Sequence, residues 1–216
     1  MSMAFPDELS LRDRKKLRTR QALIDTALDW FTEKGFEATT LDELCAAVEI
    51  SKRTFFRYFT SKEDVAMAPT QDLWAAFLTE LETPAPGRDR PLIDLLHDTL
   101  RTALDRMPAD GWADRALRSR RLAARVPSMN AHGLEFCDRT TRAALSTLGE
   151  VFELDPHDLR PRLALDIMIA AFHCALEEWT LRPGPADRDA LAACLSEAYA
   201  AARASTALIM TRRARP

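Results

Sequence analysis

Apolar residues recur at helical spacing along most of the chain. In residues 11–34 they form one stripe at steps of three and four residues, centred on Leu23, Ala27 and Phe31. Gly35 follows at the position where a helix ends in a left-handed residue. Glycine is scarce, with 6 in 216 residues, and no stretch alternates polar and apolar residues between hairpin turns. The pattern predicts an all-α protein.

Two short helices joined by a tight turn are predicted between residues 39 and 59. Thr40 and Glu43 have the spacing of a capping box, and Ser51 is a suitable N-cap for the second helix. Phe55 and Phe59 lie four residues apart and are expected to point inward together. The outward residues are then Lys52, Arg53, Thr54, Arg57 and Tyr58.

This outer edge carries basic and hydroxyl groups, which suits a helix that enters the DNA major groove. For these residues alone, an ordinary helical hairpin with a solvated basic face is the alternative. The neighbouring sequence favours DNA binding, because residues 11–20 hold six Lys or Arg against one Asp. We expect that basic front to contact phosphates or a flanking minor groove.

Residues 12–66 resemble the N-terminal DNA-binding domain of the TetR family of transcriptional repressors. The matching phrases are ALDWFTEKGFEATTLDELCAAVEIS and KRTFFRYFTSKEDV. The resemblance implies a three-helix helix-turn-helix domain at 11–60 and a C-terminal helical ligand-binding and dimerisation domain at 61–213. It further implies a homodimeric repressor that binds a palindromic operator in double-stranded DNA and is released by a small apolar or amphipathic effector.

Two positions depart from the family pattern. Glu49 stands in the turn where Gly is usual, so it either adopts a left-handed conformation at some cost or the turn differs. Phe56 replaces the usual Tyr and lacks its hydroxyl, which Tyr58 is expected to supply. The DNA-binding residues that the resemblance implies are Thr40, Ser51, Lys52, Arg53, Thr54, Phe56, Arg57, Tyr58 and Lys62.

The rest of the chain is helical by pattern. Ser61 is expected to cap a fourth helix that Pro69 interrupts or restarts, and residues 83–91 have the composition of a linker. The segment 161–182 is apolar around most of its circumference, and about 188–210 is rich in Ala. Such helices need cover on more than one side, so we expect the last two helices to form the dimer.

A largely apolar effector pocket is expected among the middle helices. The phrase SRRLAARVPSMNAHGLEF, together with FFRYF, resembles a branch of the family whose pocket domain is described as acyl-CoA-like. Apolar side chains of this kind more often belong to the hydrophobic core than to a pocket, but one residue can do both. The candidate ligand-binding residues are Leu100, Leu104, Leu122, Met129, His132, Phe136, Met168, Phe172 and Trp179.

Catalytic and metal-binding patterns are absent from the sequence. Four Cys and four His are scattered without zinc-finger spacing, and no Gly-rich phosphate loop, GxSxG or HExxH occurs. We therefore expect no enzyme activity, cofactor or metal, and thiols that stay reduced in the cytoplasm. No run of eighteen apolar residues predicts a membrane span.

Two alternatives to the repressor remain at this point. One is a small-molecule-binding helical protein with a vestigial helix-turn-helix, which only Glu49 and Phe56 support. The other is an all-α enzyme, which the missing catalytic pattern disfavours. The net charge of −3 does not discriminate among these three interpretations, because DNA binding depends on the local basic surface and not on the total charge of the chain.

Overall fold

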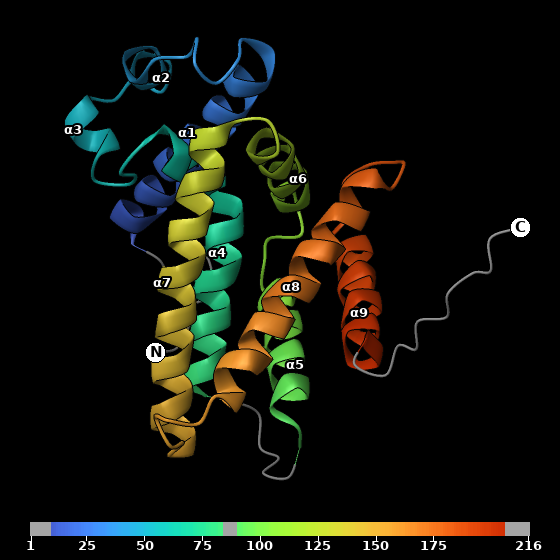
Figure 1. Cartoon of the computed structure of the whole chain (residues 1–216). Helices are drawn as coiled ribbons and strands as arrows, with labels where there is room; N and C mark the ends of the chain where they lie inside the picture. Colours follow the sequence, from blue (N-terminus) through green and yellow to red (C-terminus); the bar gives the residue numbers. More distant parts are fainter. Residues whose placement is uncertain (1–9, 84–89, 206–216) are drawn as a thin grey trace, which may run out of the picture. The chain divides into compact units, whose positions relative to one another are not determined.

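The computed structural model describes residues 10–83 and 90–205, and within these residues all regular secondary structure is helical (Figure 1). This confirms the predicted all-α class. The elements are α1 (Leu11–Glu33), α2 (Leu41–Ala47), α3 (Lys52–Phe55), α4 (Lys62–Glu82), α5 (Leu92–Asp105), α6 (Trp112–Ala123), α7 (Pro127–Phe152), α8 (Arg160–Leu181) and α9 (Arg188–Ser205).

The described residues divide into two compact units. The first comprises residues 10–71 and 115–136, and we call it the DNA-binding unit after the function that its sequence leads us to expect. The second, the C-terminal unit, comprises residues 72–83, 90–114 and 137–205. This division by contacts does not coincide with the expected domain boundary at residue 60. Most of α6 and the first part of α7 pack with the helix-turn-helix, and α4 contributes its first half to the DNA-binding unit. The expected domain end at 213 lies outside the described residues.

The core of the DNA-binding unit joins α1 to the helix-turn-helix. Leu23 and Phe31 of α1 and Leu44 of α2 are at most 2% exposed, and Phe55 is fully buried beside them. Met129 of α7 belongs to the same core and is also fully buried. These apolar contacts hold the short helices α2 and α3, which are below the length at which isolated helices persist in water.

Polar contacts fasten α6 and α7 to the rest of this unit. The Arg118 guanidinium lies 2.5 Å from the Asp29 carboxylate, and Arg115 lies 3.5 Å from Asp25. On α7, the side chain of His132 lies 3.2 Å from Gln71 of α4. Helix α6 is thus attached to α1, and α7 is attached to α4.

Several helix ends follow the sequence expectations. Gly35 has φ +96° directly after the α1 C-cap, a conformation that strains any residue with a Cβ. The Ser61 hydroxyl accepts a hydrogen bond from the Asp64 amide, 3.2 Å away, as expected for the cap of α4. Pro69 corrects the prediction, because α4 runs through it without a break from residue 62 to 82. A single proline inside a long, well-packed helix is tolerated when the surrounding turns remain hydrogen-bonded.

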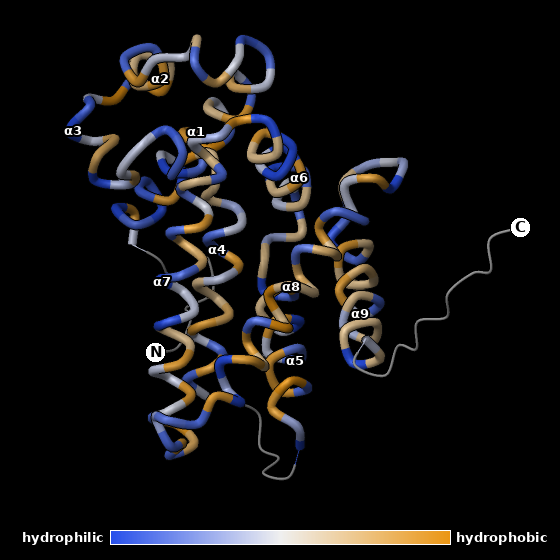
Figure 2. Tube along the Cα trace, in the orientation of Figure 1, coloured by the Kyte–Doolittle hydropathy of each residue, from blue (hydrophilic) through white to orange (hydrophobic). Residues whose placement is uncertain are grey.

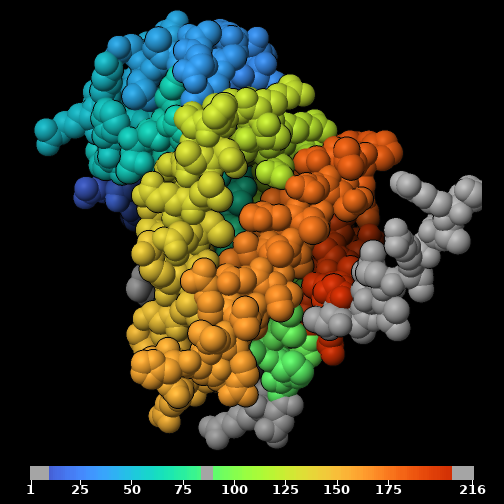
Figure 3. Space-filling model, in the orientation of Figure 1, coloured from blue at the N-terminus to red at the C-terminus, as the bar shows by residue number. Residues whose placement is uncertain are grey.

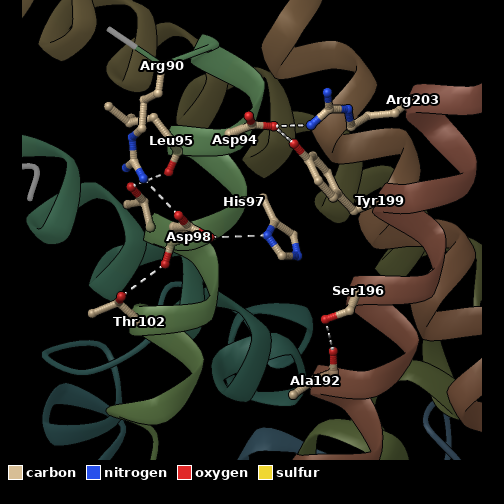
Figure 4. Close-up of polar contacts among 11 residues, drawn as sticks. Arg90, Asp94, Leu95, His97, Asp98, Thr102, Ala192, Ser196, Tyr199 and Arg203 are labelled. Atoms are coloured by element: carbon tan, nitrogen blue, oxygen red, sulfur yellow. Dashed lines mark hydrogen bonds and ion pairs between the residues drawn. The ribbon is translucent and has the colours of Figure 1, made fainter. Parts of the chain in front are cut away.

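In the C-terminal unit, α8 and α9 pack along each other, and α5 contacts both. Trp74 of α4 meets Phe172 of α8 edge to face at a centroid distance of 5.1 Å. Between α5 and α9, the Tyr199 hydroxyl and the Arg203 guanidinium both bind the Asp94 carboxylate (Figure 4). The expected linker at 83–91 lies largely outside the described residues, as does the expected end of the last helix at 210.

Helix α8 exposes an apolar strip. Leu163 is 56% exposed and Ile167 is 39% exposed, four residues further along the same face. Hydrophobic positions follow most of this helix (Figure 2), and its atoms lie on the face drawn in Figure 3. No helix among the described residues is both long enough and apolar enough to cross a membrane.

Candidate nucleic-acid interface

Thr40 begins α2 with a complete capping box. Its amide and hydroxyl donate hydrogen bonds of 2.9 and 2.7 Å to the Glu43 carboxylate, and the Glu43 amide returns one of 3.2 Å to the hydroxyl. These bonds, the hydroxyl's first, lower the pKa of Glu43. The expected capping box is therefore present. Both hydrogen-bond donors of Thr40, which is a predicted DNA-binding residue, are therefore already bound to this carboxylate.

The turn between α2 and α3 is closed by Glu49 in the left-handed region, with φ 55°. The next amide, that of Ile50, donates to the carbonyl of Cys45 over 2.9 Å. This is the first of the two outcomes expected for Glu49, and a β-carbon in this conformation carries a modest strain. The helix-turn-helix therefore closes with Glu in the position where Gly is usual.

The recognition segment is a short helix followed by further helical turns. Ser51 caps α3 by accepting the Thr54 amide over 3.1 Å, and the two hydroxyls lie 3.0 Å apart. Beyond α3, the Phe59 amide still donates to the Phe55 carbonyl over 3.0 Å. Phe55 and Phe59 are 0% and 3% exposed with ring centroids 5.9 Å apart, which confirms that they point inward together.

Lys52 and Lys62 are both held within the DNA-binding unit. The Lys52 ammonium pairs with the exposed Asp42 carboxylate over 2.8 Å. The Lys62 ammonium donates to two backbone carbonyls between α1 and α2, those of Phe36 at 2.8 Å and Thr39 at 3.0 Å. It also lies 4.6 Å from the centroid of the Phe36 ring. Lys62 therefore fastens the segment that leads into Thr40.

Asp64 fastens the other end of the helix-turn-helix. Its carboxylate accepts the Thr60 amide over 2.7 Å and the Thr60 hydroxyl over 3.0 Å. The same side chain lies 3.7 Å from the His132 ring of α7. Lys62 and Asp64, both in the first turn of α4, thus hold the segments before α2 and after α3. Sequence reasoning did not identify Asp64 or Asp42; for Asp64 the local signal was its spacing of four residues from Thr60.

The remaining outward residues form what we call the open face: Arg53, Phe56 and Arg57. All are exposed, and Phe56 is 54% exposed. Neither guanidinium makes a hydrogen bond or ion pair with any part of the chain that the structure describes, although Arg57 lies 5.2 Å from the Tyr58 ring. Tyr58 itself is half-buried against the core. Free guanidinium forks on a short helix can bind guanine edges or phosphates.

The candidate ligand residues are divided between the two units. Leu100, Leu104, Met168, Phe172 and Trp179 are all buried in the C-terminal unit, where the Trp179 indole donates to the Asp187 carbonyl over 3.1 Å. The others, in the DNA-binding unit, are Leu122, Met129, His132 and Phe136.

A small pocket of about 300 Å³ lies in the C-terminal unit and is lined by none of these candidates. It lies at the start of α9, between residues 109–114 and 186–189. The Arg188 guanidinium beside it donates to the carbonyls of Met107 and Asp105.

Comparison with known proteins agrees with this geometry. Residues 23–68 match the family model described as bacterial regulatory proteins of the tetR family, and residues 90–207 match the model of the MftR C-terminal domain. The chain is 35% identical over 201 residues to the HTH-type transcriptional regulator TcmR of Streptomyces glaucescens, covering 89% of this chain and 86% of that protein.

Solved structures share the fold. A TetR-family regulator from Syntrophomonas wolfei has a TM-score of 0.53 at 17% identity, over 86% of this chain and 95% of that one. Thermus thermophilus FadR, crystallised with lauroyl-CoA, has a TM-score of 0.51 at 21% identity, over 91% and 99%. The helix-turn-helix geometry, the two matching family models and the relationship to TcmR together show that this chain belongs to the TetR family of DNA-binding transcriptional regulators.

Proposed function

We propose that the protein is a homodimeric repressor that reads a palindromic operator with its open face and leaves it when a small apolar or amphipathic effector binds. The observation that carries the proposal is a pair of guanidinium groups, those of Arg53 and Arg57, that have no hydrogen-bond or ion-pair partner among the described residues. They lie on a recognition segment whose backbone is fixed at both ends. A rigid basic helix with free forked donors is what major-groove reading requires.

Within this face we assign base reading to Arg53 and backbone contact to the residues around it. Arg53 is the second residue of α3, near the helix end that enters the groove in helix-turn-helix proteins. The competing assignment is that Arg57 or Thr54 reads the bases while Arg53 binds phosphate. Four of the residues assigned to the DNA backbone would each first exchange a bond inside the protein for one to phosphate: Thr40, Ser51, Lys52 and Lys62. Tyr58 is the fifth residue assigned to the backbone.

The proposed dimer uses α8 and α9. Leu163 and Ile167 form an exposed apolar strip on α8, and the exposed positions of α9 include the small residues Ala193 and Ala200. Two copies related by a twofold axis would bury this strip against itself or against α9 of the partner. Their recognition helices must then match successive major grooves, about 34–36 Å or a multiple apart.

The proposed effector binds among the apolar side chains of the C-terminal region, of which Met168, Phe172 and Trp179 are buried members. Effector and operator compete because each favours a different arrangement of the dimer. Coupling is proposed to run through α4, whose two halves belong to different units. The acyl-CoA-like branch indicated by residues 119–136 stays a prediction.

The test starts with selection of an operator from a random duplex library using the full-length protein. Affinity for the selected and a scrambled duplex is then measured between 50 and 200 mM salt, and each neutralised phosphate should steepen the log–log salt slope by about 0.9. A repressor shows a steep slope on both duplexes and a preference for the selected one. A vestigial helix-turn-helix would enrich no sequence and show no salt-dependent binding.

A further inference from the structure

We propose that Phe56 reads the 5-methyl group of a thymine in the major groove and makes operator recognition depend on a thymine beside the base that an arginine reads. The inference rests on the proposed function, because it assumes that the open face meets DNA. It specifies the base, thymine, at one position of the operator half-site.

Phe56 lies in the middle of the open face. It follows Arg53 by three residues and precedes Arg57 by one, and residues three or four apart share a helical face. Its ring is 54% exposed, whereas Phe55 next to it is fully buried. An exposed apolar ring is therefore part of the same open face as two cationic side chains.

The backbone holds this ring in place. The Phe56 amide donates to the Lys52 carbonyl over 2.9 Å, so the residue is fixed to the start of the recognition helix. The Phe55 ring meets the Phe56 ring edge to face, with centroids 5.5 Å apart and planes at 88°. A buried aromatic ring thus supports an exposed one, which limits its freedom before DNA arrives and lowers the entropy lost on contact.

The chemistry of the groove identifies the partner. A phenyl ring has no donor or acceptor, so Phe56 cannot bind a phosphate or a polar base edge. The thymine methyl is the one apolar group on the floor of the major groove, and Phe is among the side chains that contact it. Contact between the ring and the methyl group would remove both apolar surfaces from water, which is favourable. In the free protein the Phe56 ring stays exposed to water.

The experiment uses deoxyuridine, which removes only the methyl group. Each thymine of the selected operator half-site is replaced in turn by deoxyuridine, and affinity is measured for the wild type, Phe56→Ala and Phe56→Leu. For the wild type we expect about a fourfold loss at one thymine, the value for one buried methyl group, roughly 0.8 kcal/mol. Phe56→Ala should lose affinity for the thymine operator and lose the response to deoxyuridine, while Phe56→Leu should keep part of that response.

Matched controls separate this contact from general weakening. Leu134 of α7 is 66% exposed in the same unit, and Leu134→Ala should bind both operators as the wild type does. Arg53→Ala should bind weakly but keep the full response to deoxyuridine. Because Phe56 is exposed, the melting temperature of Phe56→Ala should stay close to that of the wild type.

Two results would overturn the inference and are distinguishable from each other. If the wild type binds its operator but no deoxyuridine substitution weakens it, or if Phe56→Ala keeps the same response, then Phe56 reads no methyl group and the proposed function stands. If the wild type binds no duplex in a salt-dependent manner, the proposed function fails and this inference fails with it.

Discussion

The two units of the molecule expose different kinds of side chain. In the DNA-binding unit, the half-buried Lys62 and Asp64 bind the backbone around the helix-turn-helix. The exposed guanidinium groups of Arg53 and Arg57 have no hydrogen-bond or ion-pair partner among the described residues. In the C-terminal unit, polar groups bind one another between α5 and α9, and the helix that remains uncovered, α8, exposes Leu163 and Ile167.

This difference indicates what each unit binds. A rigid segment with free cations suits a polyanion, because little is lost in ordering it and much is gained from phosphate neutralisation. An exposed apolar strip suits a second copy of the chain, because burying it removes nonpolar area from water.

The largest effect is expected on α8. The double substitution Leu163→Glu with Ile167→Glu should convert the dimer to a monomer, because unpaired charges buried at the interface cost about 3 kcal/mol or more. Both positions are exposed in the protomer, so each protomer should keep its helical circular dichroism. Light scattering at micromolar concentration measures the mass. A wild type that is monomeric under these conditions would remove the basis of the comparison.

Ala171→Glu provides the contrast on the same helix. Ala171 is 8% exposed, so its substitution by Glu should unfold the C-terminal unit and lower the melting temperature instead of only separating two protomers. Glu178, also on α8, is exposed and charged already, and Glu178→Gln should leave both mass and melting temperature unchanged.

The second prediction concerns the open face. Arg53→Ala should weaken operator binding by about 1–3 kcal/mol and relax selectivity at one base pair, with folding stability unchanged because the guanidinium has no partner in the described chain. Titration against operator and scrambled duplex measures both effects. Equal losses on the two duplexes would show that Arg53 contacts the backbone only, and Arg57→Ala would then be the variant to examine for lost selectivity.

The third prediction tests whether Lys62 stabilises the segment before α2 or contacts a DNA phosphate. Lys62→Met removes two hydrogen bonds to carbonyls, and because the ammonium is only half-buried the loss of stability should be about 1–2 kcal/mol. If Lys62 acts by holding residues 36–39, all duplexes should be bound more weakly with the salt slope unchanged. A slope lower by about one unit would instead assign Lys62 a phosphate.

The sequence predicted those features that depend on contacts between residues close together in the chain. The capping box of Thr40 and Glu43, the left-handed Gly35 and the inward pair Phe55 and Phe59 all depend on neighbours within four residues, and each was predictable. The partners of Lys62 lie 23 and 26 residues away and are backbone carbonyls, which no side-chain pattern marks. The sequence therefore predicted Lys62 as a DNA-binding residue but did not predict that it binds these carbonyls.

The C-terminal unit was predictable only as a set of helices. Met168 and Phe172 were expected to lie in the core or to line a pocket, and both are buried. Periodicity could not tell which helices they face, since every apolar stripe fits several neighbours. For the same reason the grouping of Met129 with the DNA-binding core was not foreseen. Pro69 was expected to break α4, but tertiary packing of the helix outweighed the local penalty.

The smallest predicted effect concerns pH and lies in the polar contacts between α5 and α9. His97 stacks on the Tyr199 ring at a centroid distance of 4.2 Å, and its Nδ1 lies 3.5 Å from the Asp98 carboxylate. Its Nε2 is buried and has no hydrogen-bond partner among the described residues. Burial disfavours the imidazolium and lowers the pKa of His97, and the nearby Asp98 only partly offsets this.

The sign of the pH dependence follows from that lowered pKa. Between the folded and unfolded pKa values the unfolded chain binds more protons, so the stabilising contribution is complete above about pH 6.5 and is lost as the pH falls through the folded value. Urea unfolding of the wild type between pH 5 and 8 should show this decline, and His97→Phe, which keeps a ring against Tyr199 but cannot titrate, should flatten it. Substitution of the exposed His157 by Gln should leave the wild-type curve unchanged. If His97→Phe declines as steeply as the wild type, the pH response originates elsewhere and the α5–α9 contacts are insensitive to protonation of His97.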